Sequence, residues 1–473
     1  MTKGHKRVPC PLRSAALESP DSEAVVGAGW SISYGELDGK VSAAEGRLKE
    51  FGVASGVRVA LYMPKNVDYI VLLLALVRAV AVACPVSTRV PAGGVGPLLE
   101  EAGCSALISA DERIFDVVDG VDALVPEAIL ADGKRDEWGP EPLEIVLDRP
   151  ATVVFTSGST RTPKAALHTF GNHYFSAAGS NGNIAPAPGN RWLHSLPLYH
   201  VGGLSIIFRC LLAGATIALP EPNAPLGDAI SELRATHISL VSTQLLRLLD
   251  EGADLSGLGT VLMGGGPIPP SLVDEALARG VPIHTSYGLT EMASQVTTTP
   301  PGASREALRT AGRALPHREV RISGDGEILV RGETLFAGYL RGGGLSLPLD
   351  DGGWFRTGDL GELDAGGYLK VAGRRDNLFV SGGENVQPEE IEAALCRIEG
   401  VHEAVVVPVP DKEYGSRPVA FVRKGGDVGD LARELERVLP RFKVPTAFHD
   451  WEGVGGMKPD RGALERRARE GGP

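Results

Sequence analysis

Short apolar runs alternate with longer helical stretches through most of this 473-residue chain. Four of these runs are ATIALP, HISLVS, TVLMGGG and PIHTSYG, and each ends in Gly, Ser or Pro. Strands that alternate with helices imply parallel sheets with both faces covered. Ligands of such folds bind beyond the carboxyl ends of the strands. The pattern therefore predicts an α/β fold, and the residues that follow each strand are the first candidates for a site.

The pattern changes near Glu327, where EILVRGETLFAGYL and GYLKVAGRRDNLFV alternate more closely, as antiparallel strands do. Further on, helices over Pro388–Ile398 and Asp427–Leu439 are expected around the strands AVVVPVP and PVAFVRK. Residues 1–375 are expected to form a large N-terminal domain of parallel-type sheets flanked by helices, with a small β-barrel-like part. Residues 376–473 are expected to form a small α+β C-terminal domain.

Composition narrows the class of protein. A chain that is 43% hydrophobic and 22% charged resembles ordinary globular proteins. The formal net charge of −12 argues against nucleic acid as a main partner, because phosphate binding needs a basic face. The most apolar run, Ile70–Val86, is short for a membrane span and contains Arg78, so membrane insertion is not expected.

Cysteine usage and the N-terminus indicate a cytoplasmic protein. No apolar segment follows the basic residues at the start, so no secretory signal is expected. The cysteines form an odd, scattered set without a CxxC pair, which points to reduced thiols. They are Cys10, Cys84, Cys104, Cys210 and Cys396.

The strongest local signal is TSGSTRTPK, from Thr156 to Lys164, directly after a strand. Its hydroxyls, its glycine, its backbone N–H groups and its one cation suit a polyphosphate. The string lacks the GxxxxGK[ST] spacing of a Walker loop. The alternative is a Ser/Thr-rich turn with an exposed lysine.

A second signal is YGLTE, from Tyr287 to Glu291, after the strand PIHTS. A hydroxyl beside a carboxylate at a strand end can hold Mg²⁺ against a phosphate oxygen, since Mg²⁺ prefers oxygen ligands. Read alone, the string is also typical of a helix N-terminus capped by Thr290.

Two more strings lie downstream. In FRTGDL, Asp359 follows a glycine turn and can accept hydrogen bonds from ribose hydroxyls, or it can form an Asx-type turn. Basic residues of Gly373–Asp376 precede the glycine-rich loop Ser381–Asn385. They suit a phosphate, or they form a solvated linker.

In this order, the four strings resemble the adenylate-forming superfamily of acyl-CoA ligases, luciferases and non-ribosomal adenylation domains. The resemblance runs from about Ser31 to Leu464. It implies an enzyme that takes a small carboxylic acid, ATP with Mg²⁺, and coenzyme A. The acid would be joined to AMP with loss of pyrophosphate, and the acyl group would then pass to CoA. The small C-terminal domain would be mobile and would rotate over the larger one.

The resemblance also assigns nucleotide contacts to single residues. The loop around the β- and γ-phosphates would contain Thr156, Ser157, Gly158, Ser159, Thr160 and Lys164. The adenosine contacts would come from Gly265, Gly266, Tyr287, Gly288, Asp359 and Arg374.

The reacting groups follow from the same resemblance. Thr290 and Glu291 would lie at the α-phosphate and Mg²⁺, and Lys458 would stabilise charge during adenylation. Asp376 would be the hinge, and Gly382 and Gly383 would face the CoA channel.

Two positions depart from the superfamily pattern. Arg161 stands where a glycine is usual, so the phosphate loop is strained if that position needs φ > 0. Residues Gly453–Gly456 precede Lys458, where many relatives have Pro-Arg-Thr. The assignment of Lys458 therefore rests on the downstream Arg461 and on the distance to the chain end.

Within the superfamily, three stretches are most similar to the o-succinylbenzoate–CoA ligases of menaquinone biosynthesis. They are LPLYHVGGLS with the following Arg209, HISLVSTQ, and DNLFVSGGENVQP. By that resemblance, Arg209 and Ser239 would hold the carboxylate that does not react, and His200 would form the pocket wall. From the residues alone, Arg209 can also lie on a helix surface and His200 in the core.

Other functions stay open. One is a ligase for another aryl or fatty acid. A less favoured one is a stand-alone adenylation enzyme that loads a carrier protein, because such enzymes usually have a pocket Asp that Tyr199–Gly203 lacks. A non-catalytic relative is disfavoured by Lys164, Glu291, Asp359 and Lys458 occurring together. The oligomeric state is left open, with a dimer as one option.

Overall fold

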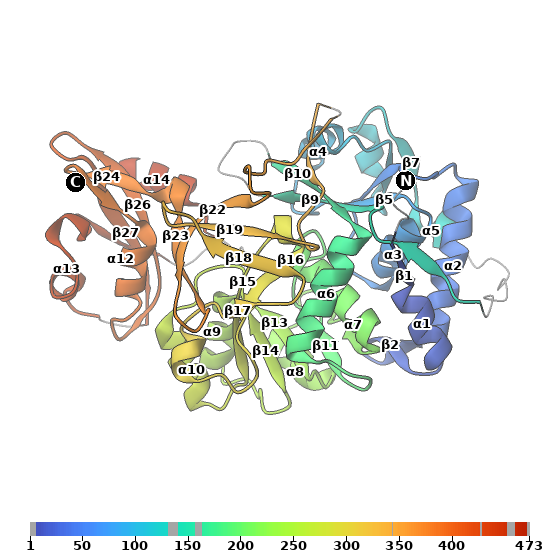
Figure 1. Cartoon of the computed structure of the whole chain (residues 1–473), viewed down its shortest axis with the longest axis horizontal. Helices are drawn as coiled ribbons and strands as arrows, with labels where there is room; N and C mark the ends of the chain where they lie inside the picture. Colours follow the sequence, from blue (N-terminus) through green and yellow to red (C-terminus); the bar gives the residue numbers. More distant parts are fainter. Residues whose placement is uncertain are drawn as a thin grey trace.

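A computed structural model of the chain describes residues 6–130, 141–156, 163–342, 344–425, 428–451 and 459–470. Two large sheets with their helices make up most of the molecule, and the residues after β23 lie at one end of its long axis (Figure 1). Ser157, Gly158, Ser159, Thr160, Arg161 and Lys458 lie outside the described residues.

The first large sheet has eight strands in the order β21-β20-β10-β9-β5-β4-β6-β7. Its strands β4 to β7 and β9 run parallel, whereas β10, β20 and β21 are joined by antiparallel pairs. The strands are β4 (Arg58–Leu61), β5 (Val82–Pro85), β6 (Ala106–Ile108), β7 (Asp122–Leu124), β9 (Pro150–Thr156), β10 (Lys164–Thr169), β20 (Gly338–Arg341) and β21 (Gly344–Ser346).

The second large sheet has nine strands in the order β17-β16-β15-β14-β13-β11-β12-β2-β3. Its centre is parallel and its two margins are antiparallel. The strands are β2 (Glu23–Gly27), β3 (Trp30–Ser33), β11 (Arg191–Leu193), β12 (Thr216–Ala218), β13 (His237–Leu240), β14 (Thr260–Met263), β15 (Ile283–Leu289), β16 (Ser294–Thr298) and β17 (Arg313–Ala314). The two sheets confirm the predicted α/β fold.

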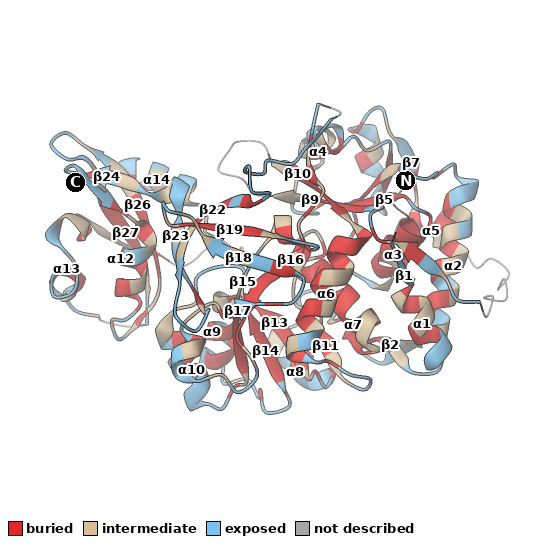
Figure 2. Ribbon diagram, in the orientation of Figure 1, coloured by how far each residue is buried: buried red, intermediate tan, exposed pale blue. Residues whose placement is uncertain are grey.

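Helices cover these sheets and fill the space between them. One buried apolar cluster contains residues of both sheets, such as Val59 and Ile217, together with helix residues such as Ile70 and Ile206. Figure 2 shows buried positions in the strands of the sheets and in the helices beside them. The helices are α1 (Pro11–Glu18), α2 (Tyr34–Glu50), α3 (Val67–Arg78), α4 (Val95–Ala102), α5 (Pro126–Leu130), α6 (Phe170–Ile184), α7 (Val201–Ala213), α8 (Leu226–Glu232), α9 (Ser242–Asp250), α10 (Pro270–Ala278) and α11 (Arg305–Leu308). A short antiparallel pair joins β1 (Arg7–Pro9) and β8 (Glu144–Val146).

The most apolar segment of the sequence is the buried helix α3. Asn66 caps its first turn by accepting a hydrogen bond from the Tyr69 N–H. The charge of Arg78 is neutralised by a buried ion pair with Asp38 of α2. None of the helices in the described ranges is long and apolar enough to cross a membrane.

The expected change to antiparallel structure near Glu327 is confirmed by a four-stranded antiparallel sheet. Its order is β18-β19-β22-β23. The strands are β18 (Arg318–Ile322), β19 (Glu327–Gly332), β22 (Phe355–Leu363) and β23 (Leu369–Arg374). The sheet connects the two large sheets to the C-terminal part.

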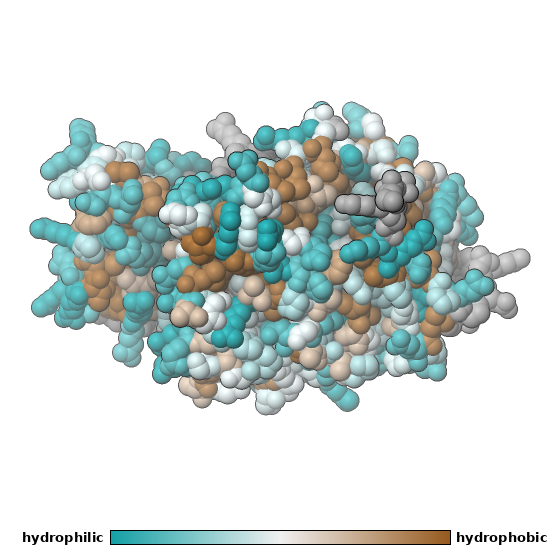
Figure 3. Space-filling model, in the orientation of Figure 1, coloured by the Kyte–Doolittle hydropathy of each residue, from teal (hydrophilic) through white to brown (hydrophobic). Residues whose placement is uncertain are grey.

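The C-terminal part has an apolar core of its own, around residues such as Val406 and Leu435. The expected helices are present but shorter than predicted, as α12 (Pro388–Leu395) and α13 (Leu431–Glu436). Its other elements are the strands β24 (Phe379–Ser381), β25 (Glu384–Val386), β26 (Val401–Asp411), β27 (Gly415–Lys424) and β28 (Phe448–Asp450) and the helix α14 (Arg461–Glu470). On the face shown in Figure 3, hydrophilic and apolar patches alternate over both parts. The predicted boundary between 375 and 376 falls in the short helix η4 (Arg375–Asn377), and it stays a prediction.

Candidate functional site

The predicted phosphate loop joins two neighbouring antiparallel strands. Thr156 ends β9 and Lys164 begins β10, and the two residues face each other in the ladder. The end of β9 and the start of β10 therefore lie side by side. The Lys164 ammonium lies 5.2 Å from the centre of the Tyr339 ring, which belongs to β20. This cation–π contact places the lysine beside a strand that is distant in sequence.

Thr290 and Glu291 follow β15 directly. The strand continues through Leu289, and Thr290 begins a single 3₁₀ turn, η3 (Thr290–Met292), without capping it. The alternative of a Thr290-capped helix is therefore wrong. The Tyr339 hydroxyl donates a 2.5 Å hydrogen bond to Glu291 Oε1. Lys164, Tyr339 and Glu291 are thereby brought together from three segments of the chain.

A buried histidine forms a hydrogen bond with the backbone of the same turn. His168 Nε2 lies 2.7 Å from the Thr290 carbonyl, so its N–H donates to that oxygen. Burial lowers the pKa of His168 to about 4, which keeps the ring neutral near pH 7. Next to it, the His173 ring stacks on Phe208, and its Nε2 forms a hydrogen bond with the Thr152 hydroxyl. Nothing in the sequence pattern distinguished His168 or Tyr339 from core residues.

Asp359 lies inside strand β22 rather than in an Asx-type turn. The Tyr287 hydroxyl donates to its Oδ2 at 2.6 Å, and Arg374 of β23 pairs with its Oδ1 at 3.1 Å. Burial, together with the Asp359 charge, raises the pKa of Tyr287 well above its ordinary value, so the hydroxyl stays a donor. Arg374 also reaches Asp376 at 3.5 Å. Four predicted residues therefore meet at one place.

The glycines predicted to contact the adenosine lie on two neighbouring parallel strands, after the end of β14 and, for Gly288, within β15. Gly264 follows β14, and Gly265 has φ +81, in the left-handed region that favours glycine. A side chain at Gly288 would come within 2.2 Å of the Ser294 carbonyl. The absence of a Cβ at Gly288 therefore lets β15 and β16 approach each other closely beside Tyr287.

Arg209 lies in the interior, and the alternative of a surface position is wrong. The residue is 1% exposed, on helix α7. Its guanidinium lies 5.2 Å from the centre of the Trp192 ring and donates to Ser294 Oγ at 3.1 Å. Among the residues that the structure describes, no group forms a hydrogen bond with its Nε. Burial lowers the pKa of Arg209 to about 10, so the group is still charged at neutral pH.

Ser239 and Arg209 meet at the same tryptophan. The Trp192 indole N–H donates to Ser239 Oγ at 3.2 Å. His200 is half-buried at the start of α7, and its ring lies 4.7 Å from that of Tyr199. It is therefore not a fully buried core histidine.

Ser294 is a residue that sequence reasoning missed. Its φ is +125 and that of Ala293 is +52, two consecutive values that L-residues rarely adopt. The unusual backbone turns the Ser294 hydroxyl toward Arg209 and Ser205. Such a backbone has no signature in a single sequence.

The C-terminal candidates are only partly described. Gly382 and Gly383 form the β24–β25 turn, with φ +60 and +86. Lys458 lies outside the described residues, but the nearby Arg461 pairs with Glu392 at 2.7 Å and donates to the Val406 carbonyl. This buried pair holds the start of α14 against α12 and β26.

The oxygen ligands of this region suit a magnesium ion shared with a substrate. Glu291 is half-buried. The Tyr339 hydroxyl contacts its Oε1, so Oε2 is the other carboxylate oxygen that could bind the ion. No group of three or more His, Cys, Asp or Glu side chains in the described ranges could hold a metal ion. A single carboxylate plus phosphate oxygens and water is the way Mg²⁺ commonly binds with nucleotides.

Two family models and several known proteins match most of the chain. A sequence model of the AMP-binding enzyme family matches residues 12–340, and one of the AMP-binding enzyme C-terminal domain matches residues 390–451. A 2-succinylbenzoate–CoA ligase of Bacillus licheniformis is 33% identical over 455 residues, which cover 93% of this chain and 95% of that protein.

Solved structures agree over nearly the whole length. The o-succinylbenzoate CoA synthetase from Bacillus subtilis in complex with the acyl-adenylate intermediate OSB-AMP is 29% identical, with a TM-score of 0.87, covering 97% of this chain and 98% of that chain. The complex of that synthetase with ATP and magnesium ion is 30% identical, with a TM-score of 0.84, covering 95% and 97%.

Proposed function

The chain belongs to the AMP-binding enzyme family, and on this premise we propose that it is an AMP-forming acid–CoA ligase for o-succinylbenzoate. It joins the succinyl carboxylate to AMP and then passes the acyl group to CoA. The product is o-succinylbenzoyl-CoA, an intermediate of menaquinone biosynthesis. ATP and CoA are substrates, and Mg²⁺ is the cofactor. With free thiols at all five cysteines, we further propose a cytoplasmic location.

One observation carries the choice of acid: the buried, charged Arg209 contacts no carboxylate among the described side chains. An unpaired charge in the interior costs several kcal/mol, and removing this cost is a reason for a ligand to bind. o-Succinylbenzoate has two carboxylates, and only one of them reacts. The other supplies the missing anion, because a guanidinium can hold a carboxylate through two parallel hydrogen bonds.

The nucleotide is proposed to bind across the ends of β15, β22 and β23. Tyr287 stacks on the adenine along Gly265 and Gly266, while Asp359 and Arg374 hold the ribose. These groups are already fixed to one another, so little order is lost when ATP binds.

Adenylation brings two anions together, so positive charge is the main requirement. The attacking carboxylate forms a bond to the α-phosphorus, and pyrophosphate leaves with the electrons of the broken P–O bond. Lys164, with the loop 156–160, is proposed to hold the β- and γ-phosphates, and Lys458 the charge that develops at the reacting phosphorus. Glu291 and Thr290 would hold Mg²⁺, which supplies further charge at the phosphate oxygens.

Thioester formation is proposed to follow a rotation at Asp376. The rotation withdraws Lys458 and brings the turn with Gly382 and Gly383 to the thiol. The CoA sulfur then attacks the acyl carbon, and AMP leaves. The mixed anhydride is already activated, so the second step needs mainly positioning.

The test is direct. The purified chain is incubated with o-succinylbenzoate, ATP, Mg²⁺ and CoA, and the thioester and AMP are measured by mass spectrometry. The expected result is o-succinylbenzoyl-CoA and AMP in equal amounts. Turnover of benzoates or fatty acids without any o-succinylbenzoyl-CoA would overturn the acid assignment. Transfer only to the phosphopantetheine of a carrier protein would overturn CoA as the acceptor.

A further inference from the structure

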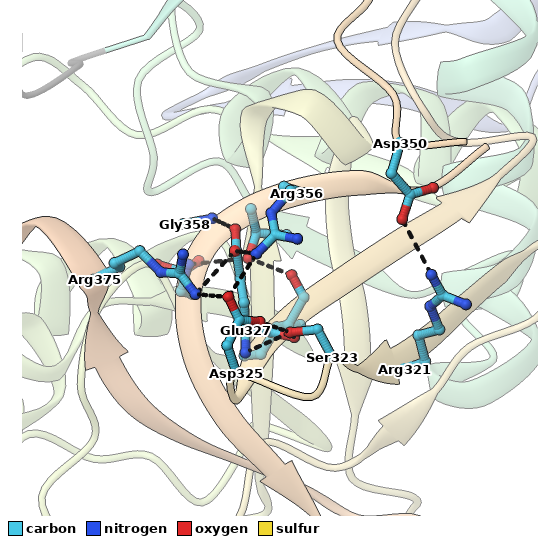
Figure 4. A network of polar contacts seen from close by, with 11 residues as sticks. Arg321, Ser323, Asp325, Glu327, Asp350, Arg356, Gly358 and Arg375 are labelled. Carbon is cyan, nitrogen blue, oxygen red and sulfur yellow. Dashed lines mark hydrogen bonds and ion pairs between the residues drawn. The ribbon is translucent and has the colours of Figure 1, made fainter. Parts of the chain in front are cut away.

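A cluster of charged side chains occupies the junction between the nucleotide residues and the chain that leads to the C-terminal part. It comprises one carboxylate on the turn between β18 and β19, one at the start of β19, and two arginines on neighbouring elements (Figure 4). The members are Asp325, Glu327, Arg356 and Arg375. The sequence indicated Arg375 only as one of the basic residues of Gly373–Asp376, and it did not predict that these four side chains meet.

Glu327 is the buried member of the cluster. The residue is 3% exposed, although it is the first residue of its strand. Its Oε1 accepts a 2.8 Å hydrogen bond from the Gly358 N–H, and its Oε2 pairs with Arg356 and, at 3.3 Å, with Arg375. One carboxylate therefore contacts two segments of the chain that are 17 residues apart.

One of the two contacted segments leads to Asp359, which is proposed to hold the ribose. The other leads to Asp376, the proposed hinge of the rotation. Gly358 has φ +75 and immediately precedes Asp359, so its N–H lies in the bend that aims that carboxylate. Arg375 lies between Arg374, which pairs with Asp359, and the proposed hinge at Asp376. A displacement of Glu327 would therefore affect both.

Asp325 is a second carboxylate that pairs with the same two arginines, and it reaches the hinge side through Arg375. It pairs with Arg375 at 2.6 Å and with Arg356 at 3.0 Å, and it accepts a hydrogen bond from the Ser323 hydroxyl. Exposed ion pairs such as those of Asp325 contribute little to stability, because water screens them. The Glu327 contacts differ, because removing a buried carboxylate leaves an N–H and an arginine without their acceptor.

On the basis of the proposed function, we propose that Glu327 is a positioning residue that holds the Asp359 bend through Gly358 and, with Asp325, pins Arg375. The chain is then fixed to the larger part as far as residue 375, and rotation begins at Asp376. Glu327 contacts Gly358 through Oε1 and Arg375 through Oε2, so substitutions can separate the two effects.

The experiment compares five variants of the full chain: E327Q, E327A, D325N, R375Q and, as the matched control, E362Q. Glu362 pairs with Lys370 at 3.1 Å on the same antiparallel sheet, but its side chain is 69% exposed. Each variant is measured for ATP–pyrophosphate exchange and for thioester formation from preformed acyl-adenylate and CoA. Cooperative thermal unfolding shows that a variant is folded.

The amide oxygen of E327Q still accepts from Gly358, so its KM for ATP should stay within about threefold of wild type, whereas E327A should raise it about tenfold. D325N and R375Q should leave that KM within about twofold and change the ratio of the two half-reaction rates at least threefold. E362Q should match wild type in both. Restoration of the KM by Gln is a result that general loss of stability does not give.

Equal KM values for E327Q and E327A, both folded, would overturn the positioning of Asp359. An unchanged ratio in R375Q and D325N would overturn the pinning of Arg375, and these two variants decide that point even if E327A does not fold. A wild-type chain that forms no thioester would instead refute the proposed function.

Discussion

The Tyr287 hydroxyl donates a 2.6 Å hydrogen bond to Asp359, and this bond joins the nine-stranded sheet to the four-stranded one. Arg374 holds the other oxygen of the same carboxylate at 3.1 Å. Asp359 is thereby oriented from both sides by residues of β15 and β23. Groups that are fixed before the ligand arrives need no reorganisation when it binds.

Replacing Tyr287 by Phe should therefore weaken ATP binding while keeping the ring. A hydrogen bond to a charged group contributes about 1.5–3 kcal/mol, so the KM for ATP in pyrophosphate exchange should rise at least about tenfold. The KM for the acid should change little. Tyr174→Phe is the control, since the Tyr174 ring packs against Phe170 and Phe175 on helix α6. The same KM for ATP in both variants would show that the bond to Asp359 is not used.

The Tyr339 hydroxyl is expected to orient Glu291 for the metal ion. In Tyr339→Phe the ring next to Lys164 is kept, and only the hydrogen bond to Glu291 is lost. Since a hydrogen bond to a charged group contributes about 1.5–3 kcal/mol, the Mg²⁺ concentration for half-maximal activity should rise at least about tenfold. The measurement is a Mg²⁺ titration at fixed ATP. An unchanged midpoint would argue that Glu291 does not need Tyr339, or does not bind the ion.

Buried neutral histidines should make the fold sensitive to acid. Burial lowers the pKa of His168 to about 4 and that of His194 to about 3. Between these values and the ordinary pKa of about 6.5, the unfolded chain binds protons that the folded chain does not, so stability falls as the pH falls.

Each of the two histidines should remove up to about 2 kcal/mol of stability between pH 7 and pH 5. Urea unfolding at the two pH values measures the difference. His168→Gln should unfold more readily at pH 7 but lose less stability on acidification. Equal losses in the variant and the wild type would mean that His168 is protonated in the folded protein.

Much of the candidate site could be predicted because its strings lie at strand ends. The alternation of strands and helices predicted the sheets, and the strings that begin at Thr156 and Tyr287 were candidates because each follows a predicted strand. Asp359 was a ribose candidate from its own glycine turn, whereas the roles of Gly265 and Arg209 came from the resemblance. The surroundings of these residues were not predictable.

What could not be predicted depends on pairing between distant segments. Tyr339 approaches Lys164 because β20 pairs with β10, with Tyr339 opposite Ala166 in the register. The strands are more than 160 residues apart, and no local pattern specifies that pairing. Glu327 was missed for a similar reason. A glutamate that follows a Gly-Asp-Gly turn is usually exposed to solvent, and here the packing of β22 against β19 buries it.

The two half-reactions should separate at Lys458. In Lys458→Ala, adenylate formation should fall at least about a hundredfold, because a charge at the reacting phosphorus is lost, as for one lost oxyanion donor. Thioester formation from synthetic acyl-adenylate should remain within about threefold of wild type. Pyrophosphate exchange and a direct thioester assay measure the two steps. Equal loss in both would refute an adenylation-specific role.

Arg209 gives the sharpest test of the acid. Arg209→Lys keeps the charge but loses two-point contact, and the KM for o-succinylbenzoate should rise about tenfold, whereas Arg209→Met should raise it a hundredfold or more. The KM for ATP should stay within about twofold in both variants.

A substrate without the aromatic carboxylate separates binding from general damage. For 4-oxo-4-phenylbutanoate, wild type and Arg209→Met should have similar kcat/KM, because the group that Arg209 would hold is absent; a double-mutant cycle then isolates the pair. Removal of a buried unpaired charge should also leave the temperature of unfolding equal or higher. A variant that loses stability and activity toward both acids alike would show that Arg209 supports the fold rather than the substrate.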